Sequence, residues 1–193
     1  MTAKPSNVLA GMTGLGNPFE IAWVADTGTA LPTDESTALN AAFKSMGLIT
    51  ADGITINTNT NSQEIDAYGA FSPVRTLIES EVKTFTITGR ETNPITVAVK
   101  ARLAISAAPT PGVGTGKYSY TEGAARDVLY SFVSHTVDGT NIIRKVFPSV
   151  RMTSLADEQI SKAQNIAYGF TMTCYPDSNG NSVYTYIAQP SLG

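Results

Sequence analysis

The stretch that most constrains the fold of this chain begins at the turn dipeptide Asp52-Gly53 and continues as an almost unbroken run of Thr and Asn. The run comprises Ile54, Thr55, Ile56, Asn57, Thr58, Asn59, Thr60 and Asn61. Thr and Asn are poor helix formers, and β-branched Thr favours extended backbone. Because so few of these side chains are apolar, the run is too polar to line a core. It therefore predicts an exposed strand or an arm.

Alternation of apolar and polar residues follows this run and changes phase once. Apolar or β-branched residues lie at even positions up to Ile78 and at odd positions from Phe85 onward. Since successive side chains of a strand point to opposite faces, the change of phase predicts a turn or β-bulge at residues 79–81. We expect a projecting arm or long hairpin over residues 47–70, followed by a return strand and an antiparallel hairpin.

The next segment, residues 94–103, carries conflicting signals. Asn93 is a favoured helix N-cap residue, and Pro94 suits the first position of a helix. The β-branched residues that follow favour a strand instead: Ile95, Thr96, Val97 and Val99. Helix and strand both remain open from the residues alone.

Several other elements are predicted from the spacing of apolar residues and from the positions of Gly and Pro. We expect a flexible N-terminal arm over residues 1–17, a strand over 19–25 and a loop rich in Pro and Gly over 107–116. Apolar residues recur at helical spacing between Asp34 and Met46, which predicts a short helix. Gly47 is placed to end that helix.

The second half of the chain contains the strongest hairpin signal. The dipeptide Asp138-Gly139 suits a two-residue turn and lies between the predicted strands 126–137 and 140–150. Residues 168–175 then alternate as a half-buried strand, and a second turn leads to a last strand over 182–188.

Residues 154–164 stay ambiguous. Ser154 and Asp157 have the spacing of a capping box, which favours a helix. A strand followed by a turn is the alternative.

Composition points to a protein that assembles. Charged residues make up 15% of the 193 residues, against about 25% in a typical soluble protein. We expect one domain, residues 1–193, with much of its surface covered by other protein. Residues 1–80 hold three basic and eight acidic side chains, whereas residues 81–193 hold ten and eight. This asymmetry is either complementarity between neighbouring copies or ordinary solvated surface.

Targeting signals and disulfides are not predicted. The start of the chain lacks the apolar region of a secretory signal, and no apolar run approaches the roughly 20 residues that a membrane-spanning helix needs. Cys174 is the single cysteine, so it cannot form an intramolecular disulfide. We expect a protein made in a reducing cytoplasm, with no membrane segment.

Candidate chemical sites are weak, and we expect no catalytic, cofactor or metal site. The single histidine, His135, and Cys174 could form a base and nucleophile, but each shares its strand face with apolar residues, which favours burial. Asp177, Asn179 and Asn181 alternate as calcium ligands do, yet a tight turn at Asn179-Gly180 explains the same residues. Basic residues do not cluster, which argues against tight binding of nucleic acid.

Four segments in a fixed order carry a family resemblance: LPTDESTALNAAFKSMGLITADGITINTNTNSQEIDAYG, VRTLIESEVKTFTITGRETN, VDGTNIIRKVFPSV and YGFTMTCYPDSNGNSVYTY. Over roughly residues 31–186 the chain resembles the major tail tube proteins of long-tailed bacteriophages of the siphovirus type, particularly those of actinobacterial hosts. The order of the segments, rather than any single one, carries the resemblance.

The resemblance implies a mainly β (α+β) fold, an antiparallel two-sheet β-sandwich or barrel with extended arms. It places one flanking α-helix at residues 94–103 and a strand and turn at 154–164. It also implies a structural virion protein, not an enzyme, that is assembled in the host cytoplasm. Stacked hexameric rings of such proteins form the tail tube that conducts the genome into the host cell. The implied partners are further copies of the chain, the tape measure, tail terminator and distal tail proteins, and passing double-stranded DNA.

Two groups of residues are the candidate functional sites. Residues 54–61 would form an arm that reaches an adjacent ring or subunit. A second group would line the lumen, where a wall that weakly repels DNA eases its passage. It comprises Glu64, Asp66, Glu79 and Glu81.

Two other functions remain open. One is a carbohydrate-binding or adhesin-like β-sandwich module, in which Trp23 and the tyrosine pairs 118/120 and 184/186 would line a groove. The other is the tube protein of a type VI-like secretion apparatus, which shares the expected architecture.

Overall fold

The computed structural model describes residue 14, residue 17 and residues 19–190. Most of the predicted N-terminal arm, residues 1–17, lies outside the described residues. The described part is mainly β, with one short α-helix, α1 (Pro94–Lys100), and one 3-10 turn, η2 (Ile105–Ala107). The strands are β1 (Ala22–Asp26), β2 (Lys44–Ser45), β3 (Ile49–Ile65), β4 (Arg75–Gly89), β5 (Leu129–Asp138), β6 (Asn141–Leu155), β7 (Tyr168–Tyr175) and β8 (Tyr184–Ala188).

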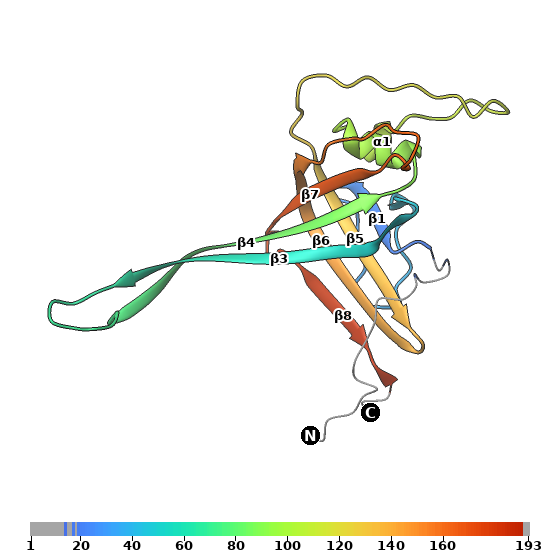
Figure 1. The fold of residues 1–193 in the computed structure, drawn as a ribbon. Helices are drawn as coiled ribbons and strands as arrows, with labels where there is room; N and C mark the ends of the chain where they lie inside the picture. Colours follow the sequence, from blue (N-terminus) through green and yellow to red (C-terminus); the bar gives the residue numbers. More distant parts are fainter. Residues whose placement is uncertain (1–13, 15–16, 18, 191–193) are drawn as a thin grey trace.

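These strands form one antiparallel sheet in the order β2-β1-β5-β6-β7-β4-β3, and β8 pairs with β6 (Figure 1). The first part of β6 pairs with β8 and its later part with β7, while β5 occupies its other edge. The turn at Asn179-Gly180 leads into β8 as predicted. However, β8 does not return along β7, because β6 and β4 already occupy both edges of β7.

The sheet curls on itself, so that strands far apart in the strand order face one another across the core. Phe85 of β4 lies 4.6 Å from Phe132 of β5 and 4.7 Å from Phe147 of β6, measured between ring centroids. All three rings are fully buried, and each contributes about 1.5–3 kcal/mol by leaving water. The expected mainly β class is confirmed, and the facing layers belong to one continuous sheet of eight strands.

The longest element is the hairpin of β3 and β4 (Figure 1). Asn61 pairs with Ser80 and Ser62 pairs with Ile78, so Glu79 is an extra residue in β4. This β-bulge explains the change of phase that the sequence shows at residues 79–81. The separate hairpin expected after the return strand is wrong, because a single strand, β4, passes straight through the bulge.

Helix α1 begins where the Asn-Pro pair predicts. The Asn93 side chain accepts hydrogen bonds from the backbone N–H groups of Ile95 and Thr96, at 3.0 and 2.8 Å. The helix ends at Lys100 instead of residue 103, because Arg102 has φ +53°. The Leu103 N–H then donates to the Ala98 carbonyl, which closes a Schellman motif.

The predicted helix over residues 34–46 is wrong. The Asp34 carboxylate instead accepts hydrogen bonds from the backbone N–H groups of Ser36 and Thr37. The guanidinium of Arg144, on β6, donates hydrogen bonds to the carbonyl oxygens of Asp34 and Thr37, at 2.8 and 2.6 Å. The Asp34 contacts alone would suit a helix N-terminus, but Arg144 holds the carbonyls of Asp34 and Thr37 against the sheet, where the segment does not continue as a helix. The segment therefore forms bends and then strand β2.

The remaining predictions agree with the structure in outline. The hairpin of β5 and β6 is present, and its turn residues are Gly139 and Thr140, since Asp138 pairs directly with Asn141. Residues 108–116 form a loop after η2. Strand β6 runs to Leu155 and no helix follows it, which agrees with the strand and turn. No helix among the described residues is long and apolar enough to cross a membrane.

Candidate functional site

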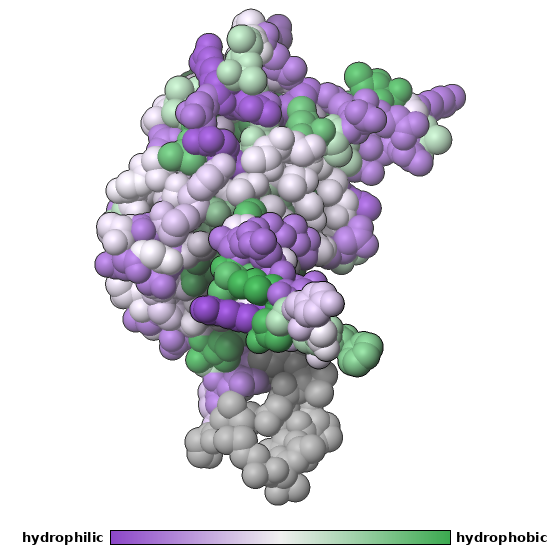
Figure 2. Space-filling model, turned by 90° about the vertical axis from the view of Figure 1, so that its left-hand side faces the viewer, coloured by the Kyte–Doolittle hydropathy of each residue, from purple (hydrophilic) through white to green (hydrophobic). Residues whose placement is uncertain are grey.

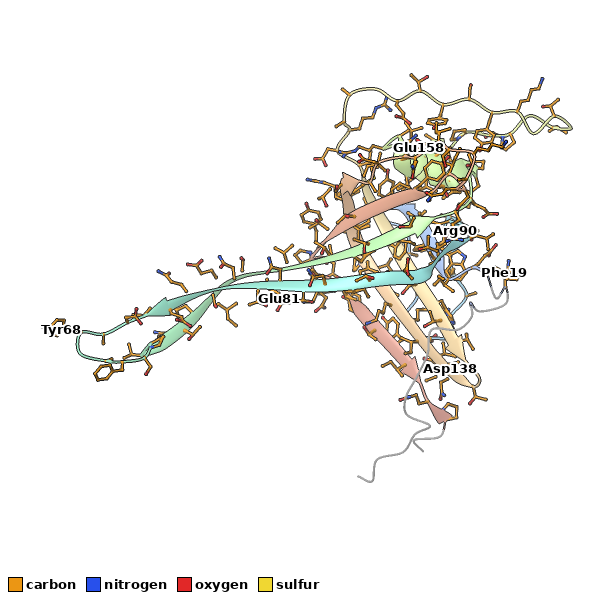
Figure 3. All side chains as sticks on the ribbon, in the orientation of Figure 1. Phe19, Tyr68, Glu81, Arg90, Asp138 and Glu158 are labelled. Carbon is orange, nitrogen blue, oxygen red and sulfur yellow. The ribbon has the colours of Figure 1, made fainter. Side chains whose placement is uncertain are left out.

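The outer half of the long hairpin leaves the body of the molecule. Strand β4 pairs with β7 only from residue 83 to residue 89, so its earlier part has β3 as its one strand partner. We call residues 59–82 the outer arm; it projects from one side of the curled sheet (Figures 1 and 3). Almost all of its side chains are exposed. The hairpin is therefore anchored in the core at one end only.

The predicted arm residues fall into two groups. Ile54 and Ile56 pair with Ile87 and Phe85, both buried, so the first part of the run lies at the root of the hairpin. Asn59, Thr60 and Asn61 belong to the outer arm and are exposed. The Thr and Asn content therefore identified an exposed strand correctly, but the arm extends much further along the chain.

The tip of the outer arm carries exposed apolar side chains that the sequence analysis missed. Tyr68 and Phe71 have relative exposures of 110% and 109%, and Val74 and Ile78 have 59% and 72%. Figure 2, which views the molecule from the side of the arm, shows hydrophobic side chains among hydrophilic ones on this face. Apolar residues concentrated on an exposed projection mark a surface that contacts another molecule. In the sequence, the available signal was the presence of two aromatic residues, Tyr68 and Phe71, in a segment that forms a turn.

The four acidic residues proposed for the lumen all lie on the outer arm. Glu79 accepts a hydrogen bond from the Asn61 amide at 3.1 Å, and Glu81 forms an ion pair with Lys83. Glu64 is exposed on β3, and Asp66 is exposed in the turn beyond it. The structure therefore brings the group together on one element, and that same element carries the predicted arm.

Open strand edges are the second assembly feature. Among the described residues, β3 ends the strand order and has no strand on its outer edge, and β8 pairs with β6 alone. Unpaired edges offer rows of backbone donors and acceptors to another chain. Figure 1 shows β3 and β8 at separate borders of the molecule.

A pocket of about 530 Å³ lies beside the N-terminal end of α1. Residues on β2, on the start of α1, on η2 and on the loop after η2 line it, among them Lys44, Ile95, Ile105, Pro109 and Pro111. The adjoining Gly47 has φ +74°, and a Cβ there would meet the Glu91 carboxylate at 1.5 Å. Glu91 in turn accepts a hydrogen bond from the Leu48 N–H at 2.9 Å. The positive φ therefore favours glycine at this wall of the pocket.

Cys174 and His135, the candidate nucleophile and base, are not arranged for catalysis. The Nδ1 atom of His135 accepts a hydrogen bond from the Nε–H of Arg144 at 2.9 Å, and burial lowers the His135 pKa to about 4. Burial raises the pKa of the Cys174 thiol to about 11, which keeps it protonated. Both residues are buried, as their strand parity predicts.

The alternating Asp177, Asn179 and Asn181 form a tight turn. The Asp177 carboxylate accepts hydrogen bonds from the backbone N–H groups of Asn179 and Asn181 and from the hydroxyl of Tyr184, at 2.9, 3.0 and 2.6 Å. These donors, the Tyr184 hydroxyl foremost, lower the pKa of Asp177. Within the described ranges, no group of three His, Cys, Asp or Glu side chains could hold a metal ion.

The tyrosines proposed for a carbohydrate groove take part in local contacts. The Tyr118 hydroxyl donates to the Thr92 carbonyl at 3.1 Å, and Tyr184 donates to Asp177. The ring of Trp23 packs edge-on against His135 with 6.4 Å between centroids. The Lys100 ammonium lies over the Tyr120 ring, with 6.0 Å between the nitrogen and the ring centroid. These contacts do not support a binding groove.

A family model described as "Phage tail tube protein" matches residues 1–191 of the chain. The chain belongs to the phage tail tube protein family. A comparison with curated proteins gave no match. A solved structure described as "Virion of native gene transfer agent (GTA) particle" is similar over 78% of this chain and 92% of that one, with 10% identity and a TM-score of 0.40. As a tail tube protein, the chain is a structural component of the virion, and the family that it belongs to is not an enzyme family.

Proposed function

We propose that this tail tube protein forms hexameric rings that stack into the tube through which the genome passes into the host cell. The observation that carries the proposal is the long hairpin, whose outer arm has an open edge and an apolar tip. In a monomer these features favour aggregation, whereas in a closed ring or a stack of rings they become interfaces.

The outer arm would contact an adjacent ring or subunit, and this extends the arm first expected at residues 54–61. Its exposed side chains run on both strands from residue 59 to residue 82. An interface that is stable between proteins takes about 800 Å² from each partner. An arm of this length, with apolar residues at its tip, can supply such a surface.

The proposal also covers where the acidic residues lie in the tube, where the tube is assembled and which proteins it contacts. Glu64, Asp66, Glu79 and Glu81 would face the passing DNA and repel it weakly, so that it does not adhere to the wall. The tube would be assembled in the cytoplasm of the host, an actinobacterium by the sequence resemblance. Tape measure, tail terminator and distal tail proteins would determine its length and its ends.

The experiment that tests the proposal removes the outer arm without disturbing its root. Thr58 and Lys83 are direct partners across the hairpin, so residues 59–82 can be replaced by Asn-Gly, a two-residue turn that suits such a pair. We expect the shortened protein to unfold cooperatively on heating, as a folded domain does, and to form no tubes in negative-stain electron microscopy.

The control is Ile160→Ser, which alters an exposed apolar residue on the loop after β6 and should leave assembly intact. Hollow tubes of unchanged width from the shortened protein would refute the role of the arm. The absence of rings and tubes from the full-length protein, even with its partner tail proteins present, would refute the tube itself.

A further inference from the structure

The tip of the outer arm needs a partner that covers apolar surface. Tyr68 and Phe71 are as exposed as in an extended chain. Burying two aromatic side chains would remove roughly 300–500 Å² from water, about half of what one partner contributes to a standard interface. The aromatic side chains of the tip can therefore stabilise an assembly only when another surface buries them.

The pocket beside α1 has the matching properties. It is an open depression of about 530 Å³, which leaves room for side chains that enter from another molecule. Ile95, Ile105, Pro109 and Pro111 give it apolar walls, and Lys44 stands at its edge. These apolar walls suit the apolar side chains of the tip.

The tip and the pocket lie at opposite ends of the molecule. In Figure 3, Tyr68 is at the far end of the arm, whereas Phe19 and Arg90 lie on the opposite side. Both are chain neighbours of pocket residues, Glu20 and Glu91. The tip therefore cannot reach the pocket of its own chain. A surface on one end and its complement on the other make a head-to-tail contact, which generates rings or stacks.

We propose that this pocket receives the arm tip of a second copy of the chain, with Tyr68 and Phe71 inserted between the proline-bearing loop and the start of α1. The inference rests on the proposed assembly into a tube. It adds the receiving surface and the anchoring side chains.

Cysteine cross-linking of full-length protein tests the contact directly. Ala70→Cys, an exposed site in the turn between Tyr68 and Phe71, is combined with Ser106→Cys at the pocket, and the protein is treated with a short bis-maleimide. The matched control combines Ala70→Cys with Ala163→Cys, an exposed site on the loop after β6. We expect covalent dimers and longer ladders from the pocket pair and only traces from the control pair. Cys174 is buried and should not react.

Parallel electron microscopy of the unmodified protein separates this inference from the proposed function. Tubes together with ladders support both. Ladders without tubes support the docking contact and count against the tube. Tubes without ladders, or ladders of equal yield from both pairs, overturn the docking contact, because another surface then receives the tip.

A pocket-filling substitution gives a second readout. Ser106→Trp adds a large side chain at the pocket, and Ala163→Trp is its control. We expect Ser106→Trp to raise the protein concentration needed for assembly roughly thirtyfold, the effect of losing a residue that dominates an interface. Its melting temperature should match that of the control. Equal assembly thresholds for the two variants would contradict the proposal.

Discussion

His135 and Arg144 form a buried polar pair in the sheet, and each has 1% relative exposure. The pair joins neighbouring strands, because the two residues are direct partners between β5 and β6. Arg144 also binds two carbonyls of the segment before β2, so one side chain holds that segment against the sheet. Protonating His135 would replace an acceptor by a donor and place a second positive charge beside the guanidinium.

The stability of the protein should therefore depend on pH between about 6.5 and 4. The His135 pKa is about 4 in the folded protein, against 6.5 for an ordinary histidine, so the unfolded chain binds the proton more readily. Stability is complete above pH 6.5 and is lost as the pH falls toward 4, by roughly 3 kcal/mol. Thermal denaturation followed by circular dichroism at pH 7, 5 and 4 measures this loss.

His135→Asn is the matched variant, because its amide oxygen can accept the Arg144 hydrogen bond and does not titrate. Its melting temperature should change less than that of the natural protein over the same interval. Asp34, whose pKa is lowered to about 2 mainly by its hydrogen bonds with Thr37, contributes only below pH 4. Parallel pH profiles for the two proteins would show that His135 does not carry the effect.

At the scale of elements, the end of α1 contains an identifiable weakness. Arg102 occupies the left-handed position of the Schellman motif, with φ +53°, where glycine is the usual residue. A side chain in that conformation costs about 1 kcal/mol. Arg102→Gly should raise the melting temperature by about 2–4 °C for a chain of this size.

Arg102→Ala is the control, because it removes the side chain and keeps the strained position. Thermal melts of the three proteins under the same conditions decide the matter. A glycine variant that melts no higher than the alanine variant would show that the left-handed backbone carries no measurable cost.

Local signals predicted the elements whose stabilising contacts are local. The N-cap of α1 depends on Asn93 and on residues two and three positions later, so the sequence was sufficient. Residues 34–46 have helical spacing, yet Arg144, more than a hundred positions away, binds their carbonyls. Such a contact leaves no local pattern. For the same reason the polar run located an exposed strand, while the reach of the outer arm depends on where β7 stops pairing with β4.

At the scale of the whole molecule, the acidic residues of the outer arm give a prediction about genome ejection. Reversing three charges together, Glu64→Lys, Asp66→Lys and Glu79→Lys, should slow DNA release, because cations on the tube wall bind phosphates. Ejection from purified virions can be followed by the fluorescence of a DNA dye at two salt concentrations. The slowing should be weaker at the higher salt concentration, since screening shortens the range of the attraction.

Asp157→Lys, on the exposed loop after β6, serves as the control and should leave the ejection rate unchanged. Tubes must first be seen in both preparations. An unchanged rate in the triple variant would show that these residues do not face the DNA.

The continuity of β4 has a mechanical consequence for any assembly built on the outer arm. One strand runs from the exposed part of the hairpin into the core, where Phe85 is buried and residues 83–89 pair with β7. A pull on the tip acts along the axis of that strand. The hydrogen bonds to β7 are then loaded together in shear, since they lie perpendicular to an antiparallel strand. In a tube whose subunits are joined through such arms, stretching would have to break all the hydrogen bonds between β4 and β7 at once.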